Sequence, residues 1–104
     1  MGKTSDIHEL TNILAKALRH RIGAMVNSNE IYAEKYAKDA DLLVKEAKKT
    51  ALRQNWNSYD KNQIKNELKK KLRIELENKD FLDSKKFDIM DEEMNKVLKE
   101  LELL

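Results

Sequence analysis

The sequence predicts an all-α fold, a small four-helix bundle built from two helical hairpins. Its 104 residues include no proline and two glycines, and charged residues make up 38% of the chain, which is a composition typical of exposed helices. Apolar residues recur every three or four positions along most of the chain, which is the spacing of a helix with one buried side. Helices joined by short connections pack against one another as antiparallel neighbours.

The first predicted helix covers residues 6–26. Asp6 followed three residues later by Glu9 has the spacing of a capping box. The predicted apolar stripe consists of Ile7, Leu10, Leu14, Ala17, Leu18, Ile22 and Met25. Residues 27–29, Asn-Ser-Asn, form the predicted break because their side chains compete for backbone hydrogen bonds. One long helix through this break stays open as an alternative, since the break contains neither proline nor glycine.

The second predicted helix covers residues 29–54, with Asn27 and Glu30 as its caps. Its stripe contains mainly small residues, which would let a partner helix approach closely. The stripe consists of Tyr32, Tyr36, Ala40, Leu43, Ala47 and Ala51. Residues 55–58 form the second break, and Trp56 within it is expected to anchor the connection in the core.

The third predicted helix begins with a cap at Ser58 or Asp60, and Gln63 completes the capping box with Asp60. Its apolar line consists of Ile64, Leu68, Leu72 and Leu76. A turn at 78–83 follows, and three aromatic or aliphatic residues are expected to hold it against the core: Phe81, Leu82 and Phe87.

The last predicted helix starts at Asp88 or Asp91, where acidic residues suit the positive end of the helix dipole. It buries Met90, Met94, Val97, Leu98 and Leu101. With no linker, repeat or low-complexity segment in view, residues 1–104 form one predicted helical domain.

Charge is divided unevenly along the chain, although the net charge is only +2. Residues 45–73 contain ten basic and three acidic side chains, whereas residues 74–104 contain five basic and ten acidic ones. Within the basic segment, cations repeat every four residues on the second and third helices, which places them in rows. The six candidate contact residues for nucleic acid or a protein partner are Lys45, Lys49, Arg53, Lys65, Lys69 and Arg73. The alternative is that these rows are solvated, or neutralised inside the fold by the acidic C-terminal segment.

No catalytic motif is recognisable in the chain, and no catalytic, cofactor-binding or metal-ligating residue is predicted. Cysteine is absent, and the two histidines, His8 and His20, are too few for a His-rich metal site. His20 beside two arginines leaves a phosphoacceptor histidine as a minor alternative to a structural role. Without an apolar run long enough to span a bilayer or a signal peptide, we expect a cytoplasmic location and no membrane contact.

Several short segments resemble the helical C-terminal domain of the motor, or restriction, subunit of type I restriction-modification enzymes. These segments are Leu18-Arg19-His20, Glu30 to Lys35, Trp56, and Leu72-Arg73-Ile74, in that order and spacing. The chain lacks the proline that the family has in the second segment, and residues 78–82 replace the family's Lys-Tyr-Gly-Tyr-Pro turn.

The resemblance implies that the chain is a C-terminal part of a larger subunit, an ATP-driven DNA translocase and nuclease whose catalytic domains lie upstream. It implies an assembly role, in which this domain docks the motor onto the methyltransferase and specificity subunits, with DNA contact as a further expectation. A free-standing helical nucleic-acid-binding domain is the alternative function.

Overall fold

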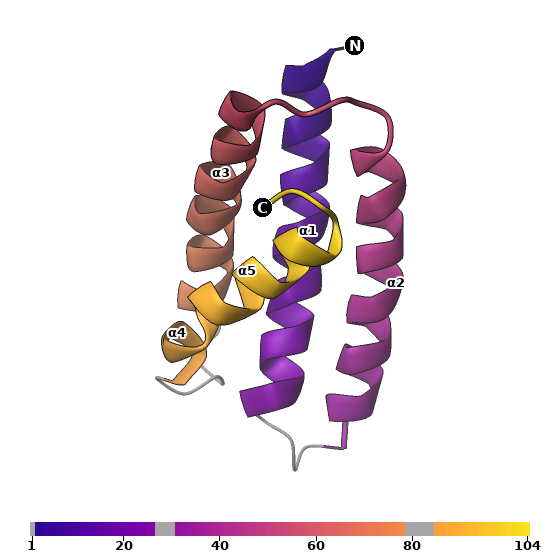
Figure 1. Ribbon diagram of the computed structural model, residues 1–104. Helices are drawn as coiled ribbons and strands as arrows, with labels where there is room; N and C mark the ends of the chain where they lie inside the picture. Colours follow the sequence, from indigo (N-terminus) through magenta and orange to yellow (C-terminus); the bar gives the residue numbers. More distant parts are fainter. Residues whose placement is uncertain (1, 27–30, 79–84) are drawn as a thin grey trace.

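The computed structural model describes residues 2–26, 31–78 and 85–104, and these residues form helices and no strands (Figure 1). The helices are α1 (Lys3–Val26), α2 (Ala33–Ala51), α3 (Ser58–Glu77), the single turn α4 (Lys85–Asp88) and α5 (Met90–Glu100). This confirms the predicted all-α helical bundle.

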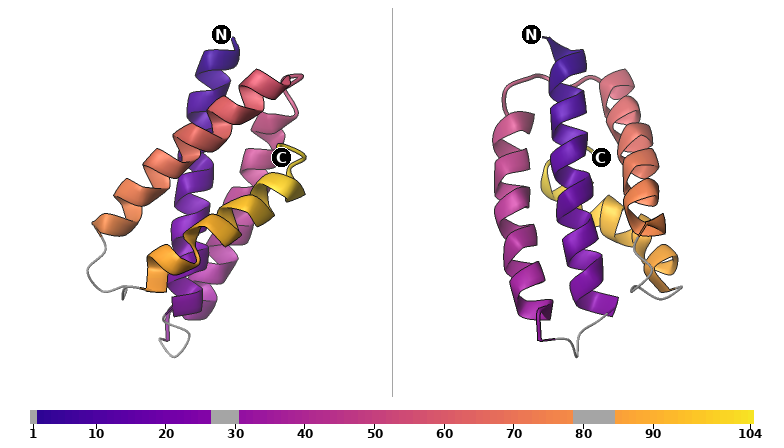
Figure 2. Two further views of the ribbon diagram at one scale, coloured as in Figure 1. Left: turned by 60° about the vertical axis from the view of Figure 1, so that its left-hand side comes forward. Right: turned by 180° about the vertical axis from the view of Figure 1, so that it is seen from behind.

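Helix α1 is the centre of the arrangement. Helices α2 and α3 pack on α1 from opposite sides, and α5 lies obliquely across α1 and α3 (Figures 1 and 2). Because α1 and α2 lie side by side and antiparallel, the alternative of one long helix through residues 27–29 is excluded. The break itself and the Asn27–Glu30 cap lie outside the described residues.

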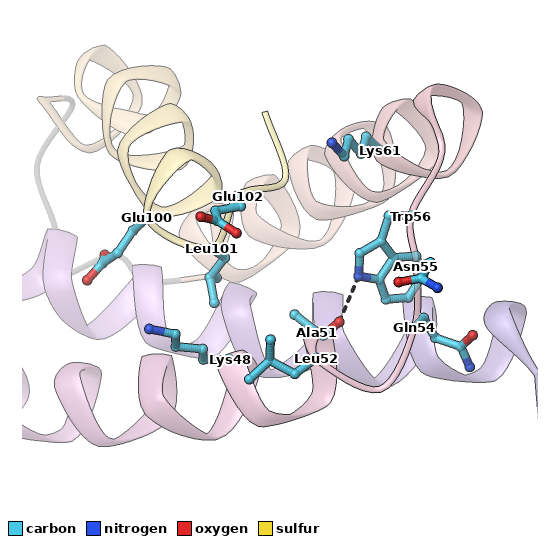
Figure 3. A pocket seen from close by; sticks show the side chains of 10 residues that line it. All are labelled: Lys48, Ala51, Leu52, Gln54, Asn55, Trp56, Lys61, Glu100, Leu101 and Glu102. Carbon is cyan, nitrogen blue, oxygen red and sulfur yellow. Dashed lines mark hydrogen bonds between the residues drawn. The ribbon is translucent and has the colours of Figure 1, made fainter.

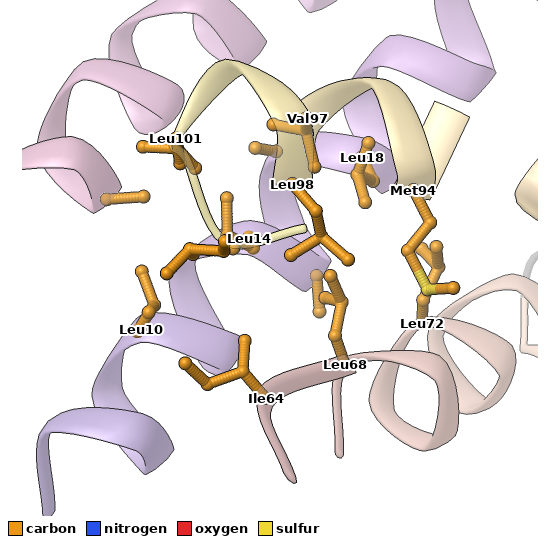
Figure 4. Close-up of a cluster of buried hydrophobic side chains, with 14 of the residues drawn as sticks. Leu10, Leu14, Leu18, Ile64, Leu68, Leu72, Met94, Val97, Leu98 and Leu101 are labelled. Atoms are coloured by element: carbon orange, nitrogen blue, oxygen red, sulfur yellow. The ribbon is translucent and has the colours of Figure 1, made fainter. Parts of the chain in front are cut away.

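The core lies where α1, α3 and α5 meet (Figure 4). Each helix contributes one row of side chains at helical spacing, as the periodicity predicts. The fully or almost fully buried residues of these rows include Leu10, Leu14, Leu18, Ile64, Leu68, Leu72, Met94, Val97 and Leu98. The α2 side is thinner, because its buried residues are mostly alanines, such as Ala40, Ala47 and Ala51.

Three predicted core residues are exposed instead. Met25 is 47% exposed, Tyr32 is 56% exposed and Phe87 is 38% exposed. Met25 is near the end of α1, Tyr32 precedes the first turn of α2 and Phe87 lies on the single turn α4, where few neighbouring elements are available to cover them. Phe81 and Leu82 lie outside the described residues.

Three predicted helix starts are wrong. Helix α2 begins at Ala33 with Tyr32 as its N-cap and ends at Ala51, so the predicted range of 29–54 is too long at both ends. Helix α1 begins at Lys3, so Asp6 lies inside it, and its carboxylate accepts a hydrogen bond from Gln54 Nε2 at 2.7 Å instead of capping the helix. The cap of α3 is Asn57, whose Oδ1 accepts from the Asp60 backbone N–H at 2.8 Å while Asp60 Oδ2 accepts from the Asn57 N–H at 3.1 Å. This is a capping box one residue before the predicted Ser58.

The predicted last helix is divided into α4 and α5 at Ile89, and Asp91, Glu92 and Glu93 occupy the first turn of α5 as expected. After α5, Glu102 has φ of 60°, and Leu103 N–H donates to Leu98 O at 2.7 Å. This is a Schellman turn. It returns Leu103 to the core, where it is 1% exposed.

Candidate partner interface

The six predicted contact residues do not form one surface. Lys45 and Lys49 lie on α2 and Arg53 follows that helix, whereas Lys65, Lys69 and Arg73 all lie on α3. Since α1 separates α2 from α3, the two rows of cations belong to different sides of the bundle (Figures 1 and 2).

Three of the six cations are paired inside the fold. Arg53 Nη1 lies 2.9 Å from Glu9 Oε2, which ties the end of α2 to α1. Lys69 Nζ lies 3.8 Å from Asp91 Oδ1, and Arg73 Nε lies 3.4 Å from Glu77 Oε1. The Lys69 pair joins α3 to the acidic start of α5, so the acidic segment does neutralise part of the basic one.

The other three cations form no hydrogen bond or ion pair with any residue that the structure describes. Lys65 is half-buried beside the core row of α3, whereas Lys45 and Lys49 are exposed on α2. All buried residues of α2 lie on the side that faces α1, so Lys45 and Lys49 project from the opposite side. These two lysines are therefore the most available of the six.

Exposed leucines accompany these lysines, and our interpretation of the sequence did not identify them. Leu42 is 63% exposed and Leu52 is 77% exposed. Both follow the same alternation of three and four positions as Lys45 and Lys49, so the pattern already contained the signal. These leucines add apolar area beside the lysines on the outer side of α2, and a protein partner could bury that area.

A groove opens at the C-terminal end of α2, between that helix and the chain after α5 (Figure 3). Its volume is ≈ 480 Å³. Trp56 lines it and packs against the core, and its Nε1–H donates to Ala51 O at 2.9 Å. The predicted anchoring of Trp56 is confirmed, because this bond satisfies a carbonyl that the end of α2 leaves unpaired. Leu52 and Lys48 line the groove on one side, and Glu100 and Glu102 line it on the other.

A polar contact between α1 and α3 was also not predicted from the sequence. Lys71 Nζ donates to Thr11 Oγ1 at 2.6 Å and to His8 O at 3.1 Å. Burial lowers the pKa of Lys71, and the Glu67 carboxylate acts in the opposite direction. Since the ammonium uses its donors within the fold, this lysine joins two helices and is not presented to a ligand.

Two further ionisable groups are held by neighbours. A hydrogen bond from Lys3 Nζ at 2.8 Å, together with the Asn57 N–H, keeps the pKa of Asp60 below its ordinary value. A hydrogen bond to Glu93 at 3.0 Å raises the pKa of Lys96. The Asp60 contacts hold the first turn of α3, whereas the Lys96 contact lies within α5.

His20 lies half-buried on α1, next to α2. Its Nε2 is 3.1 Å from Arg19 Nη2, and its ring centre is 5.7 Å from that of Tyr36. These contacts place the imidazole ring in the packing between α1 and α2.

Within residues 2–26, 31–78 and 85–104, no three His, Asp or Glu side chains gather closely enough to hold a metal ion. None of the described helices combines the length and the apolar content needed to cross a membrane. Comparisons with models of protein families, with curated proteins and with solved structures give no match.

Proposed function

We propose that this chain is a docking module, the C-terminal helical domain of the motor subunit of a type I restriction enzyme, and that it binds the methyltransferase and specificity subunits. The observation that supports docking is the outer side of α2. The principal contacts of this helix are all with α1. Leu42, Lys45 and Lys49 are exposed on its other side. In this proposal the domain performs no chemistry, and catalysis belongs to upstream domains of the parent subunit.

The segments that resemble the motor subunit contribute to the shape of the domain. Leu18 and Leu72 are completely buried, and the hydrogen bond from Trp56 to Ala51 O fixes the connection between α2 and α3 to the end of α2. Residues at such positions maintain the helical packing that a docking surface requires.

Pull-down against the purified methyltransferase–specificity core tests this function. The chain carries an affinity tag, the core is added at low and at physiological salt, and retention is measured by quantitative electrophoresis. We expect retention that weakens as salt increases, because exposed lysines contribute to the contact. A core that is not retained at any salt concentration contradicts the proposal.

The alternative is a free-standing nucleic-acid-binding domain, which the exposure of Lys45 and Lys49 favours. Six free cations would give a slope of log affinity against log salt near −5, whereas the three without ion pairs in the described chain would give about −3. Binding to a duplex DNA oligonucleotide, measured by fluorescence anisotropy over a salt series, distinguishes these cases. An absent or salt-independent anisotropy change contradicts the alternative.

A further inference from the structure

One side of α2 carries a row of exposed residues at coiled-coil spacing, which we term the outer stripe. The steps along it alternate between three and four residues, which is the spacing of positions that face a partner helix. The outer stripe consists of Lys35, Lys38, Leu42, Lys45, Lys49 and Leu52. All six residues are exposed, and Leu52 caps the helix at its C-terminal end.

The buried side of α2 orients this row. Ala40, Val44 and Ala47 are 7% exposed or less and pack toward α1. An α-helix has 3.6 residues per turn, so the side chains of Leu42 and Lys49 project from the side opposite these residues. The outer stripe is therefore held rigidly on a helix and covered by no described part of the chain.

The charges around the outer stripe discriminate between possible partners. Its four lysines are flanked by acidic side chains, which are Glu34, Asp41 and Glu46 among the exposed residues. With Lys48 and Asp39 included, α2 contains five basic and four acidic residues. A phosphate backbone would meet these carboxylates within a Debye length of about 8–10 Å, and it offers nothing apolar to Leu42. A partner with localised rather than continuous negative charge fits this helix better.

We propose that the outer stripe binds an α-helix of a partner protein whose contact seam carries carboxylates around an apolar residue. Lys45 and Lys49 would pair with those carboxylates, and Leu42 would be buried against the apolar residue. Lys38 already pairs with Glu34 on the same helix at 3.4 Å. At the end of the outer stripe, Leu52 also lines the groove that Trp56 and Glu102 line. A helix lying along α2 would therefore end over this groove. This inference rests on the proposed docking function and identifies its surface and the chemistry of its partner.

The test compares two double charge reversals in the pull-down with the methyltransferase–specificity core. Lys45→Glu with Lys49→Glu changes the outer stripe, and Lys69→Glu with Arg73→Glu makes the same charge change at the same spacing on α3. We expect the α2 double variant to lower affinity at least about tenfold and the α3 double variant to change it by less than about threefold. Leu42→Ala should lower affinity about tenfold as well. Circular dichroism verifies that each variant remains helical.

A zero-length carbodiimide cross-linker identifies the partner residues, because it joins a lysine only to a carboxylate in direct contact. We expect cross-links from Lys45 or Lys49 to Asp or Glu residues on a helix of the methyltransferase–specificity core. Replacing the linked carboxylates by lysine should restore binding of the α2 double variant.

Other outcomes overturn the inference in distinguishable ways. If the core retains the α2 double variant but not the α3 double variant, docking is upheld and the outer stripe is not its surface. If Lys45→Glu with Lys49→Glu abolishes binding of duplex DNA and leaves core binding unchanged, the stripe binds nucleic acid and the inference is wrong. If the wild-type chain is not retained at all, the proposed function fails together with the inference.

Discussion

Leu98→Ala tests how strongly α5 is held on the rest of the bundle. Leu98 is 0% exposed and lies in the core between α1, α3 and α5 (Figure 4). The substitution removes three buried carbons, which at about 0.8 kcal/mol each gives about 2.4 kcal/mol of lost transfer free energy. The cavity that remains adds to this loss, so we expect a decrease of about 3–4 kcal/mol in the free energy of unfolding. A domain of this length has about 5–15 kcal/mol in total.

The assay is urea unfolding followed by far-UV circular dichroism and by the fluorescence of Trp56, which is the single tryptophan. Trp56 reports on the α2–α3 connection, so coincident transitions show that α5 unfolds together with the rest of the chain. Leu104→Ala is the matched control, because Leu104 is 54% exposed and should lose about 0.5 kcal/mol or less. A loss below about 1 kcal/mol for Leu98→Ala would refute the packing of α5 described above.

Two further predictions concern the chain end and the α3 cap. Glu102→Gly should raise the free energy of unfolding by about 0.5 kcal/mol, because glycine adopts the φ of 60° without strain, and this gain exceeds the extra backbone entropy that glycine loses on folding. The control is Glu100→Gly in the last turn of α5, which should lower the free energy of unfolding by about 1 kcal/mol. A destabilised Glu102→Gly variant in thermal denaturation would contradict this account. Because the pKa of Asp60 is lowered in the folded chain, its carboxylate stabilises the fold fully above the ordinary value of 3.8, and this contribution is lost as pH falls through the lower folded value. Asp60→Asn should therefore be less stable than wild type at neutral pH, and the difference in stability should shrink below pH 3.8. A difference that stays constant down to about pH 2 would show that the Lys3 contact does not lower the pKa of this carboxyl.

Local patterns account for most of what could be predicted. The rows at Leu10, Leu14 and Leu18 and at Ile64, Leu68 and Leu72 are recognisable because helical periodicity depends only on neighbours three and four residues away. The acidic first turn of α5 follows from the helix dipole in the same way. Exposure at the ends of elements is less predictable, as Met25 and Tyr32 show, because it depends on which distant segment covers them.

The state of the six cations illustrates what could not be predicted. Arg53 and Lys69 look equivalent to Lys45 in the sequence, yet each finds a carboxylate on another helix, Glu9 and Asp91 respectively. These pairs join residues far apart in the chain, so no spacing rule identifies them. The contact of Lys71 with Thr11 and His8 has the same origin.

By itself, the sequence determined the helical class of this protein, the approximate extent of its long helices and most of the residues that face its core, because those properties arise from local periodicity. Only the tertiary structure decided which charges remain available. By packing α2 and α3 on opposite sides of α1, it separated the two rows of cations, paired much of one row and left the outer stripe of α2 exposed.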